Sequence, residues 1–138
     1  KVIIQCKKAE KTTLNNGGRS RRGFIHVNDV ADAIWKAICN GKIGEVYHIA
    51  HQGELISMKE LVQKIYKKMN VDFSSSVVIG PENPWRDAVY SLDASKAMRD
   101  LDWRPKISLD EGIEQTISWI ETNWSHLKDV SLTYEHKS

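Results

Sequence analysis

The chain has 138 residues, 41% hydrophobic and 28% charged, which fits one globular domain with a single core. No apolar run reaches the ~20 residues that a membrane-spanning helix needs, and no charged segment followed by an apolar one opens the sequence. Cys6 and Cys39 stand far apart without a partner motif, so we expect free thiols in a reducing cytoplasm, with a disulfide as the alternative. Composition therefore predicts a cytoplasmic protein without a membrane partner.

The net charge of +2 is unevenly distributed along the chain. Seven of the twenty Lys and Arg residues lie within the first 22 positions, against Glu10 alone, which leaves thirteen basic and seventeen acidic residues in the rest. An anion should therefore prefer the N-terminal side. The alternative is a solvated basic face without a ligand.

The first elements are predicted at the basic end of the chain. Thr12–Leu14 favours a short strand, and the residues at 15–18 favour a turn, because Asn and Gly accept positive φ. We expect a hairpin that returns the chain into a second strand at 24–27. Such a hairpin would place three arginines beside it: Arg19, Arg21 and Arg22.

The stretch from 22 to 34 organises the rest of the interpretation. Alternating β-branched and aromatic residues at 24–27 favour a strand, and Asn28 can cap a following helix. Asp29 adds negative charge at the positive end of that helix. The helix is predicted from 29 to about 40, with a core-facing stripe that consists of Val30, Ala33, Ile34, Ala37 and Ile38.

Downstream, helices and short strands are predicted to alternate. Gly41 should end the first long helix, and 45–49 reads as a strand. Ser57 and Glu60 form a capping box that opens a helix from 58 to about 69. A strand at 77–79 and an extended segment at 88–92 follow.

The last third is predicted to be helical. Asp93 should cap a short helix that turns Ala94, Ala97, Met98 and Leu101 inward. A second capping box at 108–111 opens the last long helix, whose inward stripe consists of Ile113, Ile117, Ile120 and Trp124. Residues 125–138 are expected to form a polar, frayed tail.

Six patches, in this order, resemble the NAD-dependent epimerase/dehydratase family. They are Arg-x-Phe-Ile-His-Val-x-Asp-Val-Ala-x-Ala-Ile (22–34), Gly-Glu-Val-Tyr-His-Ile (44–49), Ser-x-x-Glu-Leu-Val (57–62), Asp-x-Ser-Lys-Ala (93–97), Leu-x-Trp-x-Pro (101–105) and Glu-Gly-Ile (111–113). This family comprises the extended short-chain dehydrogenases that act on nucleotide sugars, with dTDP-glucose 4,6-dehydratase and UDP-sugar epimerases as near relatives. The resemblance implies an α/β fold: a C-terminal portion of an extended Rossmann-type enzyme, with short strands and three to four helices. Residues 1–124 would be its substrate-binding portion.

The same resemblance implies that catalytic parts are missing. Family enzymes hold NAD(P) on a Gly-rich strand–turn–helix and use a Tyr-x-x-x-Lys pair for proton exchange. Neither motif occurs in these 138 residues. We therefore expect a fragment that by itself has no catalytic residue, no cofactor site and no activity. His48-x-x-His51 has the wrong context for a metal pair, so no metal is expected.

What remains is recognition of the nucleotide sugar by its diphosphate. By resemblance, Arg22 stands where the family places an arginine on the diphosphate, and Asn16, Gly17 and Gly18 replace the Gly-Asp-Gly turn before it. The alternative for Arg22 is an ion pair with Asp29 or Asp87. The family's second arginine is absent, because Asn83 stands at its place, and Arg86, three residues later, either compensates or pairs with Asp87.

A second hypothesis treats the chain as a small α/β module whose basic segment at 7–22 binds nucleic acid or another polyanion. The ordered patches favour the nucleotide-sugar hypothesis, so nucleic acid is not the expected partner. We also expect a homodimer through the strand at 44–49, because an exposed sheet edge offers free N–H and C=O groups to another chain.

Overall fold

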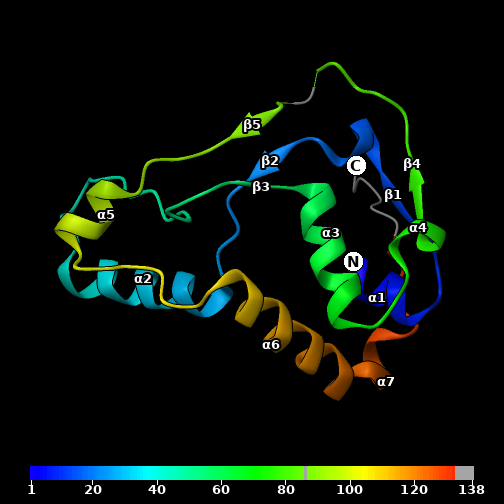
Figure 1. Ribbon diagram of the computed structural model, residues 1–138. Helices are drawn as coiled ribbons and strands as arrows, with labels where there is room; N and C mark the ends of the chain where they lie inside the picture. The colour runs from blue at the N-terminus through cyan, green and yellow to red at the C-terminus, as the bar shows by residue number, and fades with distance from the viewer. Residues whose placement is uncertain (86, 133–138) are drawn as a thin grey trace, which may run out of the picture.

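The computed structural model describes residues 1–85 and 87–132, which form a small α/β fold with short strands, as predicted (Figure 1). Its elements are α1 (Val2–Lys7), β1 (Thr12–Leu14), the 3₁₀ turn η1 (Asn15–Gly18), β2 (Arg21–Arg22), α2 (Val27–Asn40), β3 (Ile56–Ser57), α3 (Met58–Lys68), α4 (Phe73–Ser76), β4 (Val77–Ile79), β5 (Val89–Tyr90), α5 (Ser95–Asp100), α6 (Leu109–Thr122) and α7 (Trp124–Leu127). Three of these helices, α2, α3 and α6, are long, and the others are four to six residues each.

The strands of the described residues form two separate small sheets. β1 pairs in parallel with β4, and β2 lies between β3, which is antiparallel to it, and β5, which is parallel. The predicted hairpin from 12–14 into 24–27 is therefore wrong: β1 takes a partner 65 positions later, and residues 24–26 connect β2 to α2 without pairing. Alternation showed that the segment is extended, but the partner is chosen by the tertiary fold.

The helix α2 begins two residues before its predicted start. His26, not Asn28, is the N-cap, and its Nδ1 accepts a hydrogen bond of 3.3 Å from the Asn28 amide. Asp29 therefore lies within the first turn, where its charge suits the helix dipole. Only part of the predicted core stripe is covered, because Ile34 and Ile38 remain exposed.

The other two long helices begin where local signals place them. Ser57 and Glu60 form the predicted capping box at α3, with both reciprocal hydrogen bonds present. At α6 the Ser108 hydroxyl accepts from the amide of Glu111, whereas the Glu111 carboxylate accepts from Gln115 Nε2, so only one half of the predicted second capping box forms. The N-cap of α5 is Ala94, not the predicted Asp93; the Asp93 carboxylate accepts instead from the amide of Ser95, the first residue of the helix.

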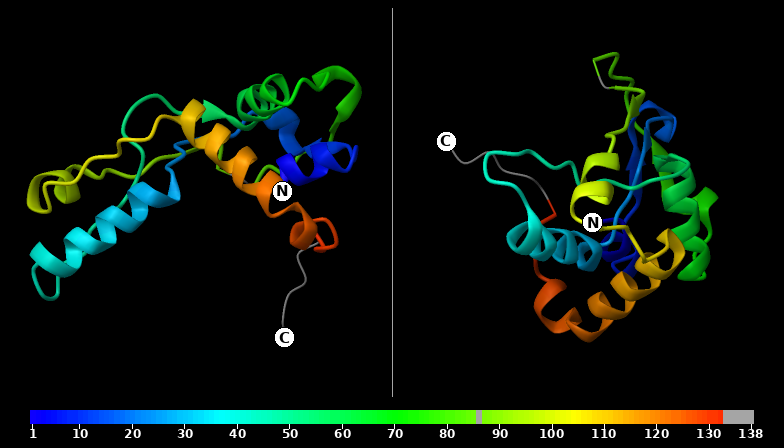
Figure 2. Two further views of the ribbon diagram at one scale, coloured as in Figure 1. Left: turned by 90° about the horizontal axis from the view of Figure 1, so that it is seen from below. Right: turned by 90° about the vertical axis from the view of Figure 1, so that its left-hand side faces the viewer.

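Two apolar clusters hold the molecule together. The larger lies between α1, α3 and α6 and consists of Ile3, Ile4, Leu14, Val62, Ile65, Tyr66, Ile113 and Ile120. The smaller joins α2 to α5 and consists of Ala33, Ala94, Ala97, Leu101 and Trp103. Figure 2 shows the result, with α2 and α5 at one end of the molecule and α1 and α3 at the other.

A buried carboxylate connects α2 to the chain before α6. Both oxygens of Asp29 accept hydrogen bonds, each 3.0 Å, from the amides of Lys106 and Ile107. The Asp29 carbonyl accepts a third, of 2.9 Å, from the indole nitrogen of Trp103. Asp29 is 4% exposed, and its polar atoms are satisfied within the fold.

The predicted strand at 45–49 does not form. Residues 45–49 enter no sheet within the described residues. Its partner is instead Lys96 of α5, whose Nζ donates to the Val46 carbonyl at 3.1 Å and lies 3.7 Å from the ring centroid of Tyr47. An extended segment becomes a strand only when another backbone lies beside it.

Helical structure continues into the region expected to be a frayed tail. α7 follows α6 directly, and Leu127 and Leu132 pack partly buried against the larger cluster. Residues 133–138 lie outside the described part of the chain. No helix within 1–85 and 87–132 has the length and apolar character needed to span a bilayer.

Candidate anion-binding site

The strand β2 places two consecutive arginines at the centre of the three-stranded sheet. Arg21 pairs with Ser57 on one side and Val89 on the other, and Arg22 pairs with Ile56 and Tyr90. Because successive side chains on a strand point to opposite faces, the two guanidinium groups lie on opposite sides of this sheet.

The half-buried side chain of Arg22 is held in one orientation by the backbone around it. Its Nη1 donates to the Arg21 carbonyl at 2.8 Å, and its Nη2 donates to the Asp87 carbonyl at 3.0 Å. Its Cζ lies 5.8 Å from the ring centroid of Tyr90, within the range of a cation–π contact. The carbonyl bonds and the tyrosine ring fix a planar donor group at the sheet surface.

Arg22 forms no ion pair with a carboxylate of the described residues, which was the alternative considered from the sequence. The bond to Asp87 goes to its main-chain oxygen, and the Asp29 carboxylate is occupied by backbone amides of the segment before α6. Among the ion pairs of the described residues, none contains Arg22. Within residues 1–85 and 87–132, the hydrogen bonds of its guanidinium go to carbonyl oxygens.

The turn η1 has the backbone conformation that its residue types predicted. Asn16, Gly17 and Gly18 have φ of +53°, +60° and +70°. Gly18 also packs against Lys59, the second residue of α3, because a Cβ there would lie 2.9 Å from the Lys59 nitrogen. The turn is thus pressed onto the start of α3.

Asn16 ties this turn to the loop that leads to β5. Its Nδ2 donates to the Asn83 carbonyl at 3.0 Å, and its Oδ1 accepts from the Asn83 amide. Beside this pair, Arg19 forms an ion pair with Glu82. A cavity of about 320 Å³ lies here, lined by Asn16, Arg19, Ser20, Glu82, Asn83, Pro84 and Ala88.

Asn16 and Arg22 contact the same loop, but they do not line one cavity. Asn16 holds the loop at residue 83, and Arg22 holds it at residue 87. Arg22 does not line the cavity beside Asn16. Arg86 lies outside the described residues, so its role stays a prediction from the sequence.

On the other face of the sheet, Arg21 lies among groups of both charges. Its guanidinium donates to the Leu55 carbonyl, and it lines a cavity of about 420 Å³ together with Arg19, Lys59 and Glu60. Hydrogen bonds from the side chain and the backbone of Ser57 hold the pKa of Glu60 below its ordinary value, and Arg21 adds to this effect. A negative carboxylate in this hollow opposes the binding of an anion.

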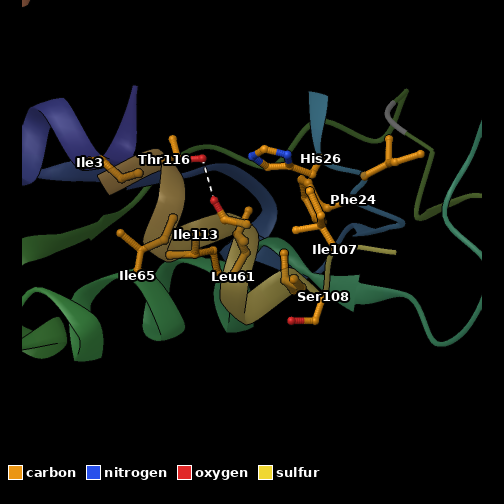
Figure 3. Close-up of a pocket in the computed structure, with 12 residues that line it drawn as sticks. Ile3, Phe24, His26, Leu61, Ile65, Ile107, Ser108, Ile113 and Thr116 are labelled. Atoms are coloured by element: carbon orange, nitrogen blue, oxygen red, sulfur yellow. Dashed lines mark hydrogen bonds between the residues drawn. The ribbon is translucent and has the colours of Figure 1, made fainter. Parts of the chain in front are cut away.

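A further cavity of about 260 Å³ is apolar and lies between α1, α3, α6 and the connection before α2 (Figure 3). Its walls include Ile3, Phe24, Leu61 and Ile113. The Thr116 hydroxyl donates to the Gly112 carbonyl at 2.6 Å, so this polar group is already paired (Figure 3). An apolar lining does not compensate the desolvation of a diphosphate.

The described residues also contain no group of three His, Cys, Asp or Glu side chains arranged to hold a metal ion.

The sequence pointed to Arg22 and the turn but not to their partners. Tyr90 and Asn83 lie 68 and 67 positions away from the residues they contact. The extended character of 88–92 was a signal for β5, but nothing local indicates that Tyr90 is in register with Arg22. In the sequence, Asn83 stands out only because it replaces the second arginine of the family.

Comparison with known proteins agrees with this fold. The family model described as GDP-mannose 4,6 dehydratase matches residues 1–116. A dTDP-glucose 4,6-dehydratase of Streptomyces niveus is 33% identical over 114 residues, covering 80% of this chain, and the human dTDP-D-glucose 4,6-dehydratase is 31% identical over 98% of it. The crystal structure of DesIV (dTDP-glucose 4,6-dehydratase) from Streptomyces venezuelae with NAD and TYD bound superposes with a TM-score of 0.83 at 27% identity, over 91% of this chain and 38% of that one.

These relatives are much longer than the sequence described in this structure. The chain spans 33% of the Streptomyces niveus protein and 39% of the human one. With a family match over most of its residues and the same fold as solved dehydratases, the chain belongs to the GDP-mannose 4,6 dehydratase family of NAD-dependent epimerases and dehydratases.

Proposed function

We propose that this chain contributes the nucleotide-sugar diphosphate contact of an NAD-dependent nucleotide-sugar epimerase or 4,6-dehydratase, and that Arg22 makes this contact. The observation that carries the proposal is the fixed guanidinium of Arg22, whose charge no carboxylate neutralises within the described structure. A nucleotide sugar presents two phosphates, and a planar guanidinium can bind phosphate oxygens at two points.

The donor count of Arg22 supports a ligand. A guanidinium has five N–H groups, and the two carbonyl bonds in the described structure use two of them. The remaining donors lie on a group whose rotamer is already fixed, which lowers the entropy cost of binding. Asn16, Gly17 and Gly18 would act by positioning the loop at 81–88, and Arg86 would supply a second positive charge.

The proposal leaves the cofactor to another part of the enzyme. NAD is present in the DesIV structure, but the eight glycines of this chain do not form the glycine fingerprint of a dinucleotide site. The sequence also lacks Tyr-x-x-x-Lys. By itself the chain should bind a nucleotide sugar without turning it over. A cytoplasmic location is part of the proposal, supported by the free thiols of Cys6 and Cys39.

The polyanion hypothesis has weaker support. Lys7 stacks on Trp124, Arg19 pairs with Glu82, and Arg21 binds a backbone carbonyl. Three of the six basic residues of 7–22 are thus engaged in separate contacts within the fold. Pairing of two chains through the extended segment at 44–49 remains a proposal, supported by its lack of a sheet partner within the described residues.

The test is calorimetric titration of the chain with dTDP, UDP and inorganic phosphate. Arg22→Ala should weaken nucleotide diphosphate binding about ten- to hundredfold, because hydrogen bonds to a charged group contribute about 1.5–3 kcal/mol. Arg22→Lys should retain only part of the affinity of the parent, since lysine lacks the planar two-point geometry. Arg99→Ala removes an exposed arginine of α5 and serves as the control. Equal affinities for the parent and both Arg22 variants would refute the proposal.

A further inference from the structure

The helix α2 is capped by an imidazole, at a position that Ser, Thr, Asp and Asn usually occupy. The backbone of His26 is extended, with φ of −77° and ψ of 145°, and its Nδ1 accepts from the Asn28 amide at 3.3 Å. A neutral imidazole carries its proton on one ring nitrogen and accepts a hydrogen bond on the other. The cap therefore places the proton of His26 on Nε2 and needs an unprotonated Nδ1.

This cap differs from a hydroxyl or carboxamide cap because a proton competes with it. In an imidazolium both ring nitrogens are donors, so Nδ1 of a protonated His26 cannot accept from the Asn28 amide. The positive charge would also lie at the positive end of the helix dipole. Protonation of His26 thus opposes the first turn of α2 in two ways.

The surroundings of the ring offer little to stabilise an imidazolium. His26 lines two hollows, which α1, α3, α6, the segment before α6 and the start of α2 enclose (Figure 3). Among the described residues that line these hollows, none is Asp, Glu, Lys or Arg. A positive charge on the ring would therefore have no ionised partner within either hollow.

The carboxylates in the first turns of α2 and α6 are already engaged elsewhere. Asp29 accepts hydrogen bonds from two backbone amides of the segment before α6. On α6, Asp110 forms an ion pair with a lysine of α3, and Glu111 accepts from a side-chain amide one turn later. An ion pair with a protonated His26 would have to displace one of these contacts.

The ring lies where α2 meets α6. Gly112 of α6 leaves room for it, because a Cβ there would lie 3.2 Å from the Cδ2 of His26. In the next turn of α2, Asp29 ties the helix to the segment before α6. A change at the cap therefore acts on the contact between the two helices as well as on α2 itself.

We propose that His26 is a proton-operated cap, which holds the first turn of α2 against α6 while the imidazole is neutral and releases it when the imidazole is protonated. Free imidazole takes up its proton near pH ~6.5. Because the unfolded chain binds this proton and the capped form opposes it, the contribution to stability is present above this pH and is lost as the pH falls through it. The device does not depend on nucleotide-sugar binding at Arg22.

NMR of the parent chain at pH 7.5 tests the cap directly. The nitrogen chemical shifts of the His26 ring should identify Nδ1 as the acceptor and Nε2 as the protonated nitrogen. This measurement needs no substitution, so it decides even if a variant does not fold. A proton on Nδ1 at this pH would overturn the proposal.

Urea denaturation between pH 5.5 and 7.5 tests the consequence. His26→Asn keeps a side-chain acceptor at the cap but cannot take up a proton. As the pH falls, the folding equilibrium constant of the parent should drop about three- to tenfold more than that of His26→Asn, with about tenfold as the limit for one imidazole that stays neutral in the folded state. Other titrating groups are common to both proteins, so they cancel in this difference.

His126→Asn is the matched control, since it removes an exposed imidazole of α7 and should keep the pH dependence of the parent. His26→Ala removes the cap altogether, so it should be less stable than the parent at pH 7.5 and approach it at pH 5.5. Equal pH dependence of the parent and His26→Asn, or a His26→Ala deficit that does not shrink as the pH falls, would overturn the proposal.

Discussion

Asn16 and Asn83 form a reciprocal pair in which one side-chain amide both donates to and accepts from the backbone of the other residue. The two residues are 67 positions apart. Their pair joins the turn η1 to the loop before β5, and Arg22 joins the same loop at residue 87. The geometry of the candidate site thus depends on a loop that is fixed at two points.

Replacing Asn16 with alanine should release the first of these points. We expect faster hydrogen exchange at the Asn83 amide and a loss of about 0.5–1.5 kcal/mol in the free energy of unfolding, the usual contribution of such hydrogen bonds. Exchange measured by NMR, with urea denaturation, provides the readout. Gln63→Ala removes an exposed amide of α3 as the control, and unchanged exchange at Asn83 in Asn16→Ala would show that the pair does not hold the loop.

Alanine substitutions at Gly18 and Gly44 separate the cost of backbone strain from the cost of a steric clash. Both have positive φ, but a Cβ at Gly18 would lie 2.9 Å from the Lys59 nitrogen, whereas a Cβ at Gly44 meets nothing within 4 Å. Gly44→Ala should cost about 1–2 kcal/mol from backbone conformation alone. Gly18→Ala should cost clearly more, because the start of α3 must also move. Thermal unfolding of both variants measures these losses of stability. Equal losses would mean that η1 does not pack closely against α3.

Asp29→Ala should be among the most destabilising single changes in α2. It removes the acceptor for the amides of Lys106 and Ile107, which are then left without this partner in a partly buried site. We expect a loss of at least about 2 kcal/mol in urea denaturation. Asp32→Ala, one turn further along, should stay within about 0.5 kcal/mol. A loss at Asp29 no larger than at Asp32 would contradict the structural role of this carboxylate.

Asp72 should make stability depend on pH in the acid range. The hydroxyl of Ser74 and then the amide of Ser75 donate to its carboxylate at the start of α4 and lower its pKa from 3.8 to about 2. Because the folded pKa lies below the unfolded one, the contribution is present above pH 4 and is lost as the pH falls through about 2. The stability difference between the parent and Asp72→Ala should therefore shrink over this window. A difference independent of pH between 2 and 5 would exclude this linkage.

Turnover is expected to be absent from the chain alone, because the proton-exchanging Tyr-x-x-x-Lys pair and the glycine fingerprint do not occur in its sequence. The purified chain with NAD and a dTDP- or UDP-hexose should give no product above a heat-killed sample. Chromatography of the sugar nucleotide provides the measurement, and product formation would show that other residues perform the chemistry.

The local sequence determined the starts of two long helices, the turn at 15–18 and the family of this protein. The starts of α3 and α6 follow from Ser57 and Ser108, because a helix cap binds an amide only three residues away. The turn at 15–18 follows from residues that accept positive φ. The ordered patches also indicated the family that the comparisons show.

The tertiary structure decided what depends on distant partners. β1 pairs with β4, Arg22 lies in register with Tyr90, and the segment at 45–49 enters no sheet within the described residues, although each of these segments looks extended in the sequence. The physical reason is that helix hydrogen bonds close within four residues, whereas a strand is completed by a backbone whose position the local sequence does not encode. For the same reason Arg22 could be named from its motif, but only the fold shows which carbonyls orient it.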